Sequence, residues 1–210
     1  MSTAQSRPIL VTGFEPFAGA RTNPSAVIAR RLHGTMIRGH AVVGVVLPCE
    51  FGRARRDLRR LVGRHRPALV VCLGLATGRT AITPERIAIN VDDARIADNA
   101  GRRPLDRPVV RGGPAAYWST LPVKSIVAAL RRRQWPAAVS QTAGTFVCNH
   151  VFYGLMHQLR RQTAVRGGFV HVPRPRRGLT VADQTAAIAV VLRVAVGRRR
   201  DAKLADGATD

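Results

Sequence analysis

One cysteine near the middle of the chain stands where a reactive thiol is expected. Cys148 lies in the string SQTAGTFVCNHVFYGLMHQL, between a loop of small residues and a run whose apolar residues recur at helical spacing. A helix that begins close to Cys148 would leave unpaired backbone amides beside the sulfur, with Gly144 for a tight turn and Thr145 as a capping hydroxyl. Such a site lowers the pKa of a cysteine from about 8.5 by one or more units. On this local pattern Cys148 is either a nucleophilic thiolate or a small buried hydrophobic cysteine.

A histidine and a carboxylate lie near the ends of other predicted strands. His171 is close to the end of a strand in GFVHVP, and Glu85 lies in the loop LGLATGRTAITPERIAIN that follows another strand. Taken singly, His171 could be a satisfied core histidine, and Glu85 a surface carboxylate or a partner of Arg86. Ligand sites gather at the carboxyl ends of the strands of an α/β sheet. If His171 and Glu85 meet Cys148 at that edge, the three would form a Cys-His-acid arrangement for nucleophilic catalysis.

Strands that alternate with helices must position these residues. The expected strands are Pro8–Thr12, Ala41–Leu47, Ala68–Leu73, Ile87–Val91, Ala137–Ser140 and Gly168–Val172. The expected helices are Pro24–Leu32 with Asn23 as its cap, Phe51–His65, Pro122–Arg133, the helix that begins near Cys148, and Val181–Val196. A long irregular connection is expected over Asp92–Trp118. The order predicts a single α/β domain over residues 1–197, with helices on both faces of the sheet, and a disordered polar tail over residues 198–210.

The composition fits one ordinary soluble domain. The chain has 210 residues, and no apolar run approaches the roughly 20 residues of a membrane helix. Its N-terminus lacks a secretory core, so we expect a cytoplasmic protein that does not bind membranes. The cysteines Cys49, Cys72 and Cys148 are too few for a disulfide framework and lack metal-ligand spacing, which predicts no metal site.

The charge is unusual for such a domain. Lys and Arg number 34 against 12 Asp and Glu, a net charge of +22 that raises the possibility of a nucleic-acid partner. The arginines are spread over helix faces, helix ends and loops, without a recognition-helix or aromatic-basic RNA-binding pattern. We therefore expect only nonspecific binding to polyanions at low salt.

Four segments carry a resemblance to a known family. TGFEPFAGARTNPS, GRTAITPERIAINVDDARIADNAG, SQTAGTFVCNHVFYGLMH and GFVHVP resemble, in order, the signature regions of pyroglutamyl peptidase I, also called pyrrolidone carboxyl peptidase, a cysteine peptidase family. The resemblance runs from about Ile9 to Val196. It implies a three-layer α/β/α sandwich around a mostly parallel, mixed and twisted sheet. It also implies removal of N-terminal pyroglutamyl (5-oxoprolyl) residues from peptides, no cofactor, and a homo-oligomer, either a dimer or a tetramer.

The family's site residues carry over onto this chain. The resemblance implies that Cys148 is the nucleophile, that His171 is the general base and acid, and that Glu85 orients His171. It also implies that Arg95 lies beside the developing oxyanion, where the backbone amide of Cys148 would help. The pocket positions implied for the substrate are Phe14, Phe17, Asn23, Cys49, Leu75, Ile96, Phe146 and Val147.

Three departures from the family's pattern bear on the substrate. Leu75, in GLATGR, stands where the family usually has glutamine in GQAGGR; Cys49, in LPCEF, stands where threonine is common; and the loop after His171 reads PRPRRG. One alternative is therefore the same triad acting on another small N-acyl or lactam amide. An alternative from a different class is a basic nucleic-acid-associated protein on a retained fold.

Overall fold

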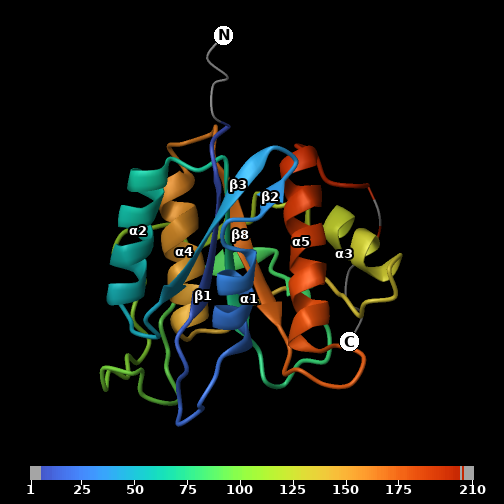
Figure 1. Cartoon of the computed structure of the whole chain (residues 1–210). Helices are drawn as coiled ribbons and strands as arrows, with labels where there is room; N and C mark the ends of the chain where they lie inside the picture. The colour runs from blue at the N-terminus through green and yellow to red at the C-terminus, as the bar shows by residue number, and fades with distance from the viewer. Residues whose placement is uncertain (1–5, 204, 206–210) are drawn as a thin grey trace.

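A mixed sheet of six strands forms the centre of the molecule. The structure, a computed structural model, describes residues 6–203 and 205. The strand order is β2-β3-β1-β4-β8-β5, and β6 and β7 form a separate two-stranded sheet (Figure 1). The strands are β1 (Ile9–Phe14), β2 (Met36–Ile37), β3 (His40–Leu47), β4 (Leu69–Leu75), β5 (Thr83–Pro84), β6 (Ile87–Ile89), β7 (Ala116–Trp118) and β8 (Arg166–Val172). Strands β3, β1, β4 and β8 run parallel, whereas β2 and β5 pair antiparallel at the two edges.

Helices cover both faces of this sheet. Helices α2 (Arg53–His65) and α4 (Val147–Leu159) lie on one face, and α1 (Pro24–Leu32), α3 (Val123–Arg131) and α5 (Val181–Gly197) lie on the other (Figure 1). Successive strand residues alternate between the two cores, so Ile9 and Val11 pack with α1 and α5 while Leu10 packs with α2 and α4. Strands β1 and β4 are buried on both faces, which is why they are nearly continuous apolar runs. The predicted three-layer α/β/α fold is confirmed.

Helix boundaries follow the capping residues of the sequence. Asn23 caps α1, as predicted, because its Oδ1 accepts a hydrogen bond from the Ser25 backbone N–H at 3.1 Å and Pro24 occupies the first helical position. Helix α5 begins with a capping box in which Thr180 and Asp183 bond each other's backbone N–H groups. These local signals explain why both helices begin where the sequence predicts.

The shortest strands were not predicted, and one predicted strand is wrong. Ala137–Ser140 forms no strand; Ala137 and Ser140 make only isolated bridges, to Ile82 and Glu85. The predictions omit β2, β5 and β7, whose two or three residues pair only through tertiary contacts. Of these, β5 matters most for the site, because its pairing of Thr83 with His171 brings the next residues of the chain to the end of β8.

The C-terminal segment begins where the domain was predicted to end. Helix α5 ends at Gly197, and in the segment that follows Asp201 accepts hydrogen bonds from the backbone N–H groups of Lys124 and Ser125, at 2.9 and 2.8 Å. Asp201 therefore caps the first turn of α3, for which Pro122 supplies no side-chain cap. Residues 204 and 206–210 of the predicted tail lie outside the described residues. Within the described part of the chain, no helix combines the length and apolarity needed to cross a membrane.

Candidate active site

A cavity of about 320 Å³ opens at the carboxyl edge of the parallel strands. It is lined by Phe14, Phe17, Asn23, Cys49, Leu75, Ala76, Thr77, Arg79, Thr142, Ala143, Gly144, Phe146, Cys148 and His171. Phe14 and Leu75 are the last residues of β1 and β4, and His171 is the last but one of β8. Ligand sites of α/β sheets gather at this edge, so the parallel strands bring together segments that are far apart in the sequence.

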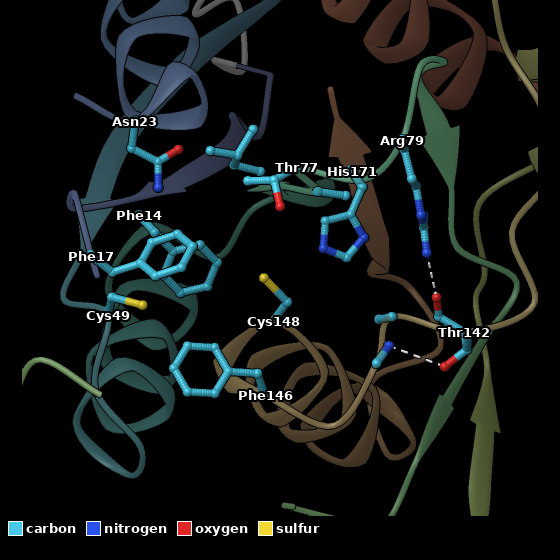
Figure 2. Close-up of a pocket in the computed structure, with 14 residues that line it drawn as sticks. Phe14, Phe17, Asn23, Cys49, Thr77, Arg79, Thr142, Phe146, Cys148 and His171 are labelled. Carbon is cyan, nitrogen blue, oxygen red and sulfur yellow. Dashed lines mark hydrogen bonds between the residues drawn. The ribbon is translucent and has the colours of Figure 1, made fainter. Parts of the chain in front are cut away.

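Cys148 is the second residue of α4, and its sulfur points into the cavity (Figure 2). Phe146 is the N-cap, in an extended conformation, and its side chain makes no capping hydrogen bond. The predicted cap at Thr145 is wrong, because Thr145 Oγ1 donates instead to the Asp93 carbonyl at 2.7 Å. The first bond of the helix runs from His150 N to Phe146 O, at 3.1 Å. The N–H groups of residues 147–149 thus have no acceptor within the helix, and they surround the thiol with amide dipoles.

A glycine in β4 makes room for the sulfur. A Cβ atom placed on Gly74 would lie 2.7 Å from Cys148 Sγ and 2.8 Å from Cζ of Phe169, closer than van der Waals contact allows. Any larger residue at position 74 would collide with the Cys148 side chain and the Phe169 ring, so that one or both would have to shift. The close approach of helix and strand fixes where the thiol stands relative to the end of the sheet.

His171 and Glu85 form a buried hydrogen-bonded pair. His171 Nδ1 lies 2.7 Å from Glu85 Oε1, and the two residues are only 4% and 0% exposed. Since a carboxylate can only accept, Nδ1 carries the proton and donates it, which leaves Nε2 free to accept. The imidazole points into the cavity that also holds the Cys148 sulfur (Figure 2). The structure therefore brings together the cysteine, histidine and acid predicted from sequence.

Arg79 is a part of this site that sequence reasoning missed. Its Nη1 donates to Glu85 Oε1 and to Thr83 Oγ1, and its Nη2 donates to the Thr142 carbonyl at 2.7 Å. The guanidinium compensates the charge of Glu85, whose Oε2 has no hydrogen-bond partner among the described residues. The signal in the sequence was the arginine that ends GLATGR, six residues before Glu85, but the spacing alone does not indicate a contact.

Burial sets the protonation of the reactive pair. It raises the pKa of the Cys148 thiol well above 9.0, with further increases from Cys49 and Glu85, while Arg79 acts in the opposite direction. Burial also lowers the pKa of His171 below 6.5, although the hydrogen bond and charge of Glu85 raise it. The expected lowering of the Cys148 pKa is therefore not confirmed, because desolvation, the largest cause, acts in the opposite direction. Both shifts favour a neutral thiol beside a neutral imidazole in the resting site.

Aromatic rings wall the other side of the cavity. The rings of Phe17 and Phe146 lie 6.1 Å apart between centroids, and Phe51 packs edge-on against Phe146 from behind at 5.3 Å. Phe14 stands at the end of β1 and contacts the ring of Phe169 at 6.3 Å. Phe14, Phe17 and Phe146, which are all predicted pocket residues, thus give the cavity apolar walls (Figure 2).

Three further predicted pocket residues also line the cavity. Asn23 is 2% exposed, and its side chain is used as a cap and as a donor to the Glu15 carbonyl at 3.1 Å. Cys49 is buried, and burial, followed by the charges of nearby carboxylates, raises its pKa to about 12. Leu75 is half-buried at the end of β4. Cys49 is therefore a neutral thiol that presents a small apolar surface.

The structure does not bring three of the predicted residues to the cavity. Arg95 and Ile96 are exposed, Ile96 at 41%, and neither belongs to the cavity lining among the described residues. Val147 is fully buried at the first position of α4, where it packs in the core under α2 and α4. Besides Arg79, the lining residues that sequence reasoning did not predict come from two short loops, Ala76, Thr77 and residues 142–144.

The donor set fits catalysis by side chains. Among the described residues, no group of three or more His, Cys, Asp or Glu side chains is arranged to hold a metal ion. The groups that face the cavity are a thiol, an imidazole oriented by a carboxylate, and unpaired amides at a helix start. Such a set suits acyl transfer through a thioester, with the amides facing negative charge on an oxygen.

Comparisons with known proteins agree with this chemistry. The family model described as pyroglutamyl peptidase matches residues 7–199. Pyrrolidone-carboxylate peptidases of Klebsiella pneumoniae and Chromobacterium violaceum are 50% and 48% identical to the chain, and each alignment covers 96% of this chain and 98% of the relative.

Solved structures match over the same extent. The pyroglutamyl peptidase I of Bacillus amyloliquefaciens superposes with a TM-score of 0.92 at 40% identity, covering 95% of this chain and all of that one. The pyrrolidone carboxyl peptidase of Thermococcus litoralis gives a TM-score of 0.91 at 34% identity, covering 95% and 99%. The fold, the cavity and these matches over nearly the whole length establish that the chain belongs to the pyroglutamyl peptidase family of cysteine peptidases.

Proposed function

We propose that this protein removes N-terminal pyroglutamyl residues from peptides through an acyl-enzyme on Cys148. The observation that carries the proposal is the convergence, in one apolar-walled cavity, of Cys148 with the 2.7 Å His171–Glu85 pair. Membership of the pyroglutamyl peptidase family supports the same reaction.

The first half of the reaction transfers the acyl group to sulfur. His171 Nε2 takes the proton from the Cys148 thiol as the sulfur attacks a carbonyl carbon of the substrate. This carbonyl is the one that links the pyroglutamyl residue to the rest of the peptide, not the lactam carbonyl of the ring. The imidazolium that forms is stabilised by Glu85, which keeps its negative charge. His171 then gives the proton to the departing amine, the C–N bond breaks, and a thioester remains on Cys148.

The second half releases the acid. Water attacks the thioester carbonyl while His171 Nε2 accepts its proton, and the C–S bond breaks as the proton returns to sulfur. Pyroglutamate leaves, and the neutral thiol and imidazole are restored. Arg79 takes no part in proton transfer; its contact with Glu85 offsets the charge of the buried carboxylate through both halves.

Negative charge on the carbonyl oxygen is stabilised by the start of α4 in this proposal. The backbone N–H of Cys148 and its neighbours in the first turn have no acceptor within the helix, and one such donor supplies about 3 to 4 kcal/mol in a transition state. Arg95 remains an oxyanion donor only by resemblance, since its exposed position does not support that role in this geometry.

The cavity suits a neutral lactam. Pyroglutamate has an apolar five-membered ring and one polar edge, and the flat faces of Phe14, Phe17 and Phe146 are apolar surfaces of matching shape. The volume of about 320 Å³ is at the small end of ligand pockets, which favours one small residue over a longer peptide segment. The partners proposed are therefore peptides that begin with pyroglutamate. A homo-oligomeric state, as dimer or tetramer, and a cytoplasmic location remain predictions.

Hydrolysis of a fluorogenic pyroglutamyl amide tests the function. Matched glutamyl and prolyl amides serve as controls, because the first adds charge and opens the ring, and the second keeps the ring but lacks the lactam carbonyl. We expect turnover of the pyroglutamyl amide alone, abolished by iodoacetamide. Equal cleavage of the prolyl amide, or full activity after alkylation of Cys148, would refute the proposal.

A further inference from the structure

A second buried histidine–carboxylate pair lies beside the first turn of α4. His150 and Asp92 are 4% and 5% exposed, and His150 Nδ1 lies 2.7 Å from Asp92 Oδ2. The other ring nitrogen, Nε2, accepts the backbone N–H of Gly52 at 3.0 Å. Because Nε2 accepts, the proton is on Nδ1, and both nitrogens of a neutral imidazole are used.

His150 joins α4 to Gly52, a contact that no other hydrogen bond of the first turn duplicates among those described. Asn149, its neighbour, already joins the helix to β6 and the residues after it, since its side chain accepts from Ile89 N at 3.0 Å and donates to the carbonyls of Ile89 and Val91 at 2.8 and 2.9 Å. His150 instead reaches the turn before α2. It therefore positions that turn relative to a helix that Asn149 already holds.

A chain of ring contacts joins His150 to the pocket. The imidazole packs edge-on against Phe51, with ring centroids 5.4 Å apart at 81°, and Phe51 packs edge-on against Phe146 at 5.3 Å and 88°. Phe146 faces Phe17 at 6.1 Å, and these last two rings line the cavity. The backbone N–H of Phe51 is held by the buried carboxylate of Asp98 at 2.7 Å, so the turn is fixed from two sides.

We infer that His150 is a positioning residue for substrate specificity, which holds Phe51 and through it the Phe146 wall against which the pyroglutamyl ring packs. Asp92 holds the tautomer that lets Nε2 accept from Gly52. The inference rests on the proposed function. His150 lies outside the cavity lining and acts on the cavity only through the aromatic wall. Its loss should therefore weaken substrate binding, while the rate of the chemical step at Cys148 stays the same.

Two substitutions separate the contacts of His150. In His150→Asn a short amide can still donate to Asp92, but the bond to Gly52 and the ring contact with Phe51 are lost. In His150→Gln the longer amide can still accept from Gly52. We expect KM for a pyroglutamyl amide to rise about fivefold or more in His150→Asn with kcat little changed, and His150→Gln to recover part of the loss.

His157→Asn is the matched control. It makes the same change two turns later on α4, where the imidazole is also hydrogen-bonded, to the Tyr117 hydroxyl at 2.9 Å, and it should leave KM unchanged. The rate of alkylation of Cys148 by iodoacetamide is measured for every variant, because a general loss of structure would change it far more than a small displacement of the aromatic wall. Phe51→Leu provides an independent variant that should reproduce the rise in KM if His150→Asn does not fold.

The outcomes separate the two proposals. Wild-type turnover with unchanged KM in the folded variants would overturn the positioning role alone. A fall in kcat and in alkylation rate at constant KM would also overturn it, because His150 would then support the nucleophile. Absence of pyroglutamyl turnover in the wild type would remove the proposed function first, and the positioning role with it.

Discussion

Burial governs the behaviour of the reactive residues. Cys148 sits at a helix start, where amide dipoles favour a thiolate, but desolvation raises the pKa of its thiol and also lowers the pKa of His171. A neutral pair avoids two buried charges in the resting enzyme. The charges then appear only as the sulfur attacks, where Glu85 and the amides of α4 stabilise them.

The pH profile should report the environment of His171. The base must be unprotonated to take the thiol proton, so activity falls as the pH decreases through its pKa, and burial places that fall below 6.5. Arg79 also lowers the pKa of His171, so Arg79→Met should move the acid limb of kcat/KM to higher pH. The measurement is kcat/KM against pH for the wild type, Arg79→Met and the exposed control Arg133→Met. An acid limb that stays in place or moves to lower pH in Arg79→Met would contradict this account of the site.

Leu75 tests whether the departure from the family's glutamine changes the substrate. The residue is half-buried at the end of β4 and contributes apolar lining to the cavity. We expect Leu75→Gln to alter pyroglutamyl kcat/KM by no more than about threefold, which corresponds to less than 1 kcal/mol. An increase of about tenfold or more would instead favour another small N-acyl or lactam amide as the natural substrate. Steady-state kinetics on the same fluorogenic amides gives the answer.

Long elements could be predicted from the sequence because their signals are local. The apolar run that becomes β1 and the Asn23 cap of α1 specify these elements without reference to the rest of the chain. The two residues of β5 carry no such signal, because they form a strand only by pairing with β8. The same difference between local signals and tertiary contacts applies to the residues of the site.

Residues of the candidate site divide in the same way. Glu85, Cys148 and His171 came from motifs, whereas Arg79 is recognised only once folding places Glu85 beside it. The exposed position of Arg95 depends on a loop conformation that motif spacing does not determine.

Gly74 tests how closely α4 must approach β4. An added methyl group would stand 2.7 Å from Cys148 Sγ, so Gly74→Ala should displace the thiol and reduce kcat by about tenfold or more. Gly63→Ala is the control, because Gly63 lies on the exposed face of α2 with nothing within 4 Å of its added Cβ, and the change should raise the free energy of unfolding by about 0.5 to 1 kcal/mol. Chemical denaturation and steady-state kinetics of both variants check the pair. Unchanged activity in Gly74→Ala would contradict the claim that the space at Gly74 fixes the position of the thiol.

The net charge of +22 belongs to the whole molecule and not to the cavity. The proposed substrate is neutral, and Arg79, which lines the cavity, is paired with Glu85. The other arginines are spread over helix surfaces, helix ends and loops, and those in a last helical turn also suit the helix dipole. The charge therefore predicts nonspecific association with polyanions and has no role in the reaction.

Salt dependence separates this association from a nucleic-acid function. We expect duplex DNA to bind in filter assays with micromolar or weaker affinity at physiological salt, and the affinity to fall steeply as salt rises. Peptidase activity should be unaffected by the DNA. Tight, sequence-dependent binding that persists at physiological salt would support the nucleic-acid alternative.

The most direct test of the central claim is detection of the acyl-enzyme. An activated pyroglutamyl ester makes acylation fast, so that acid quenching during turnover should trap protein heavier by one pyroglutamyl group in intact-mass spectrometry. We predict that the added mass maps to the peptide containing Cys148, is released by hydroxylamine as expected for a thioester, and is absent from folded Cys148→Ala. An adduct that persists in Cys148→Ala, or turnover of the ester by that variant at the wild-type rate, would contradict the assignment of Cys148 as the nucleophile.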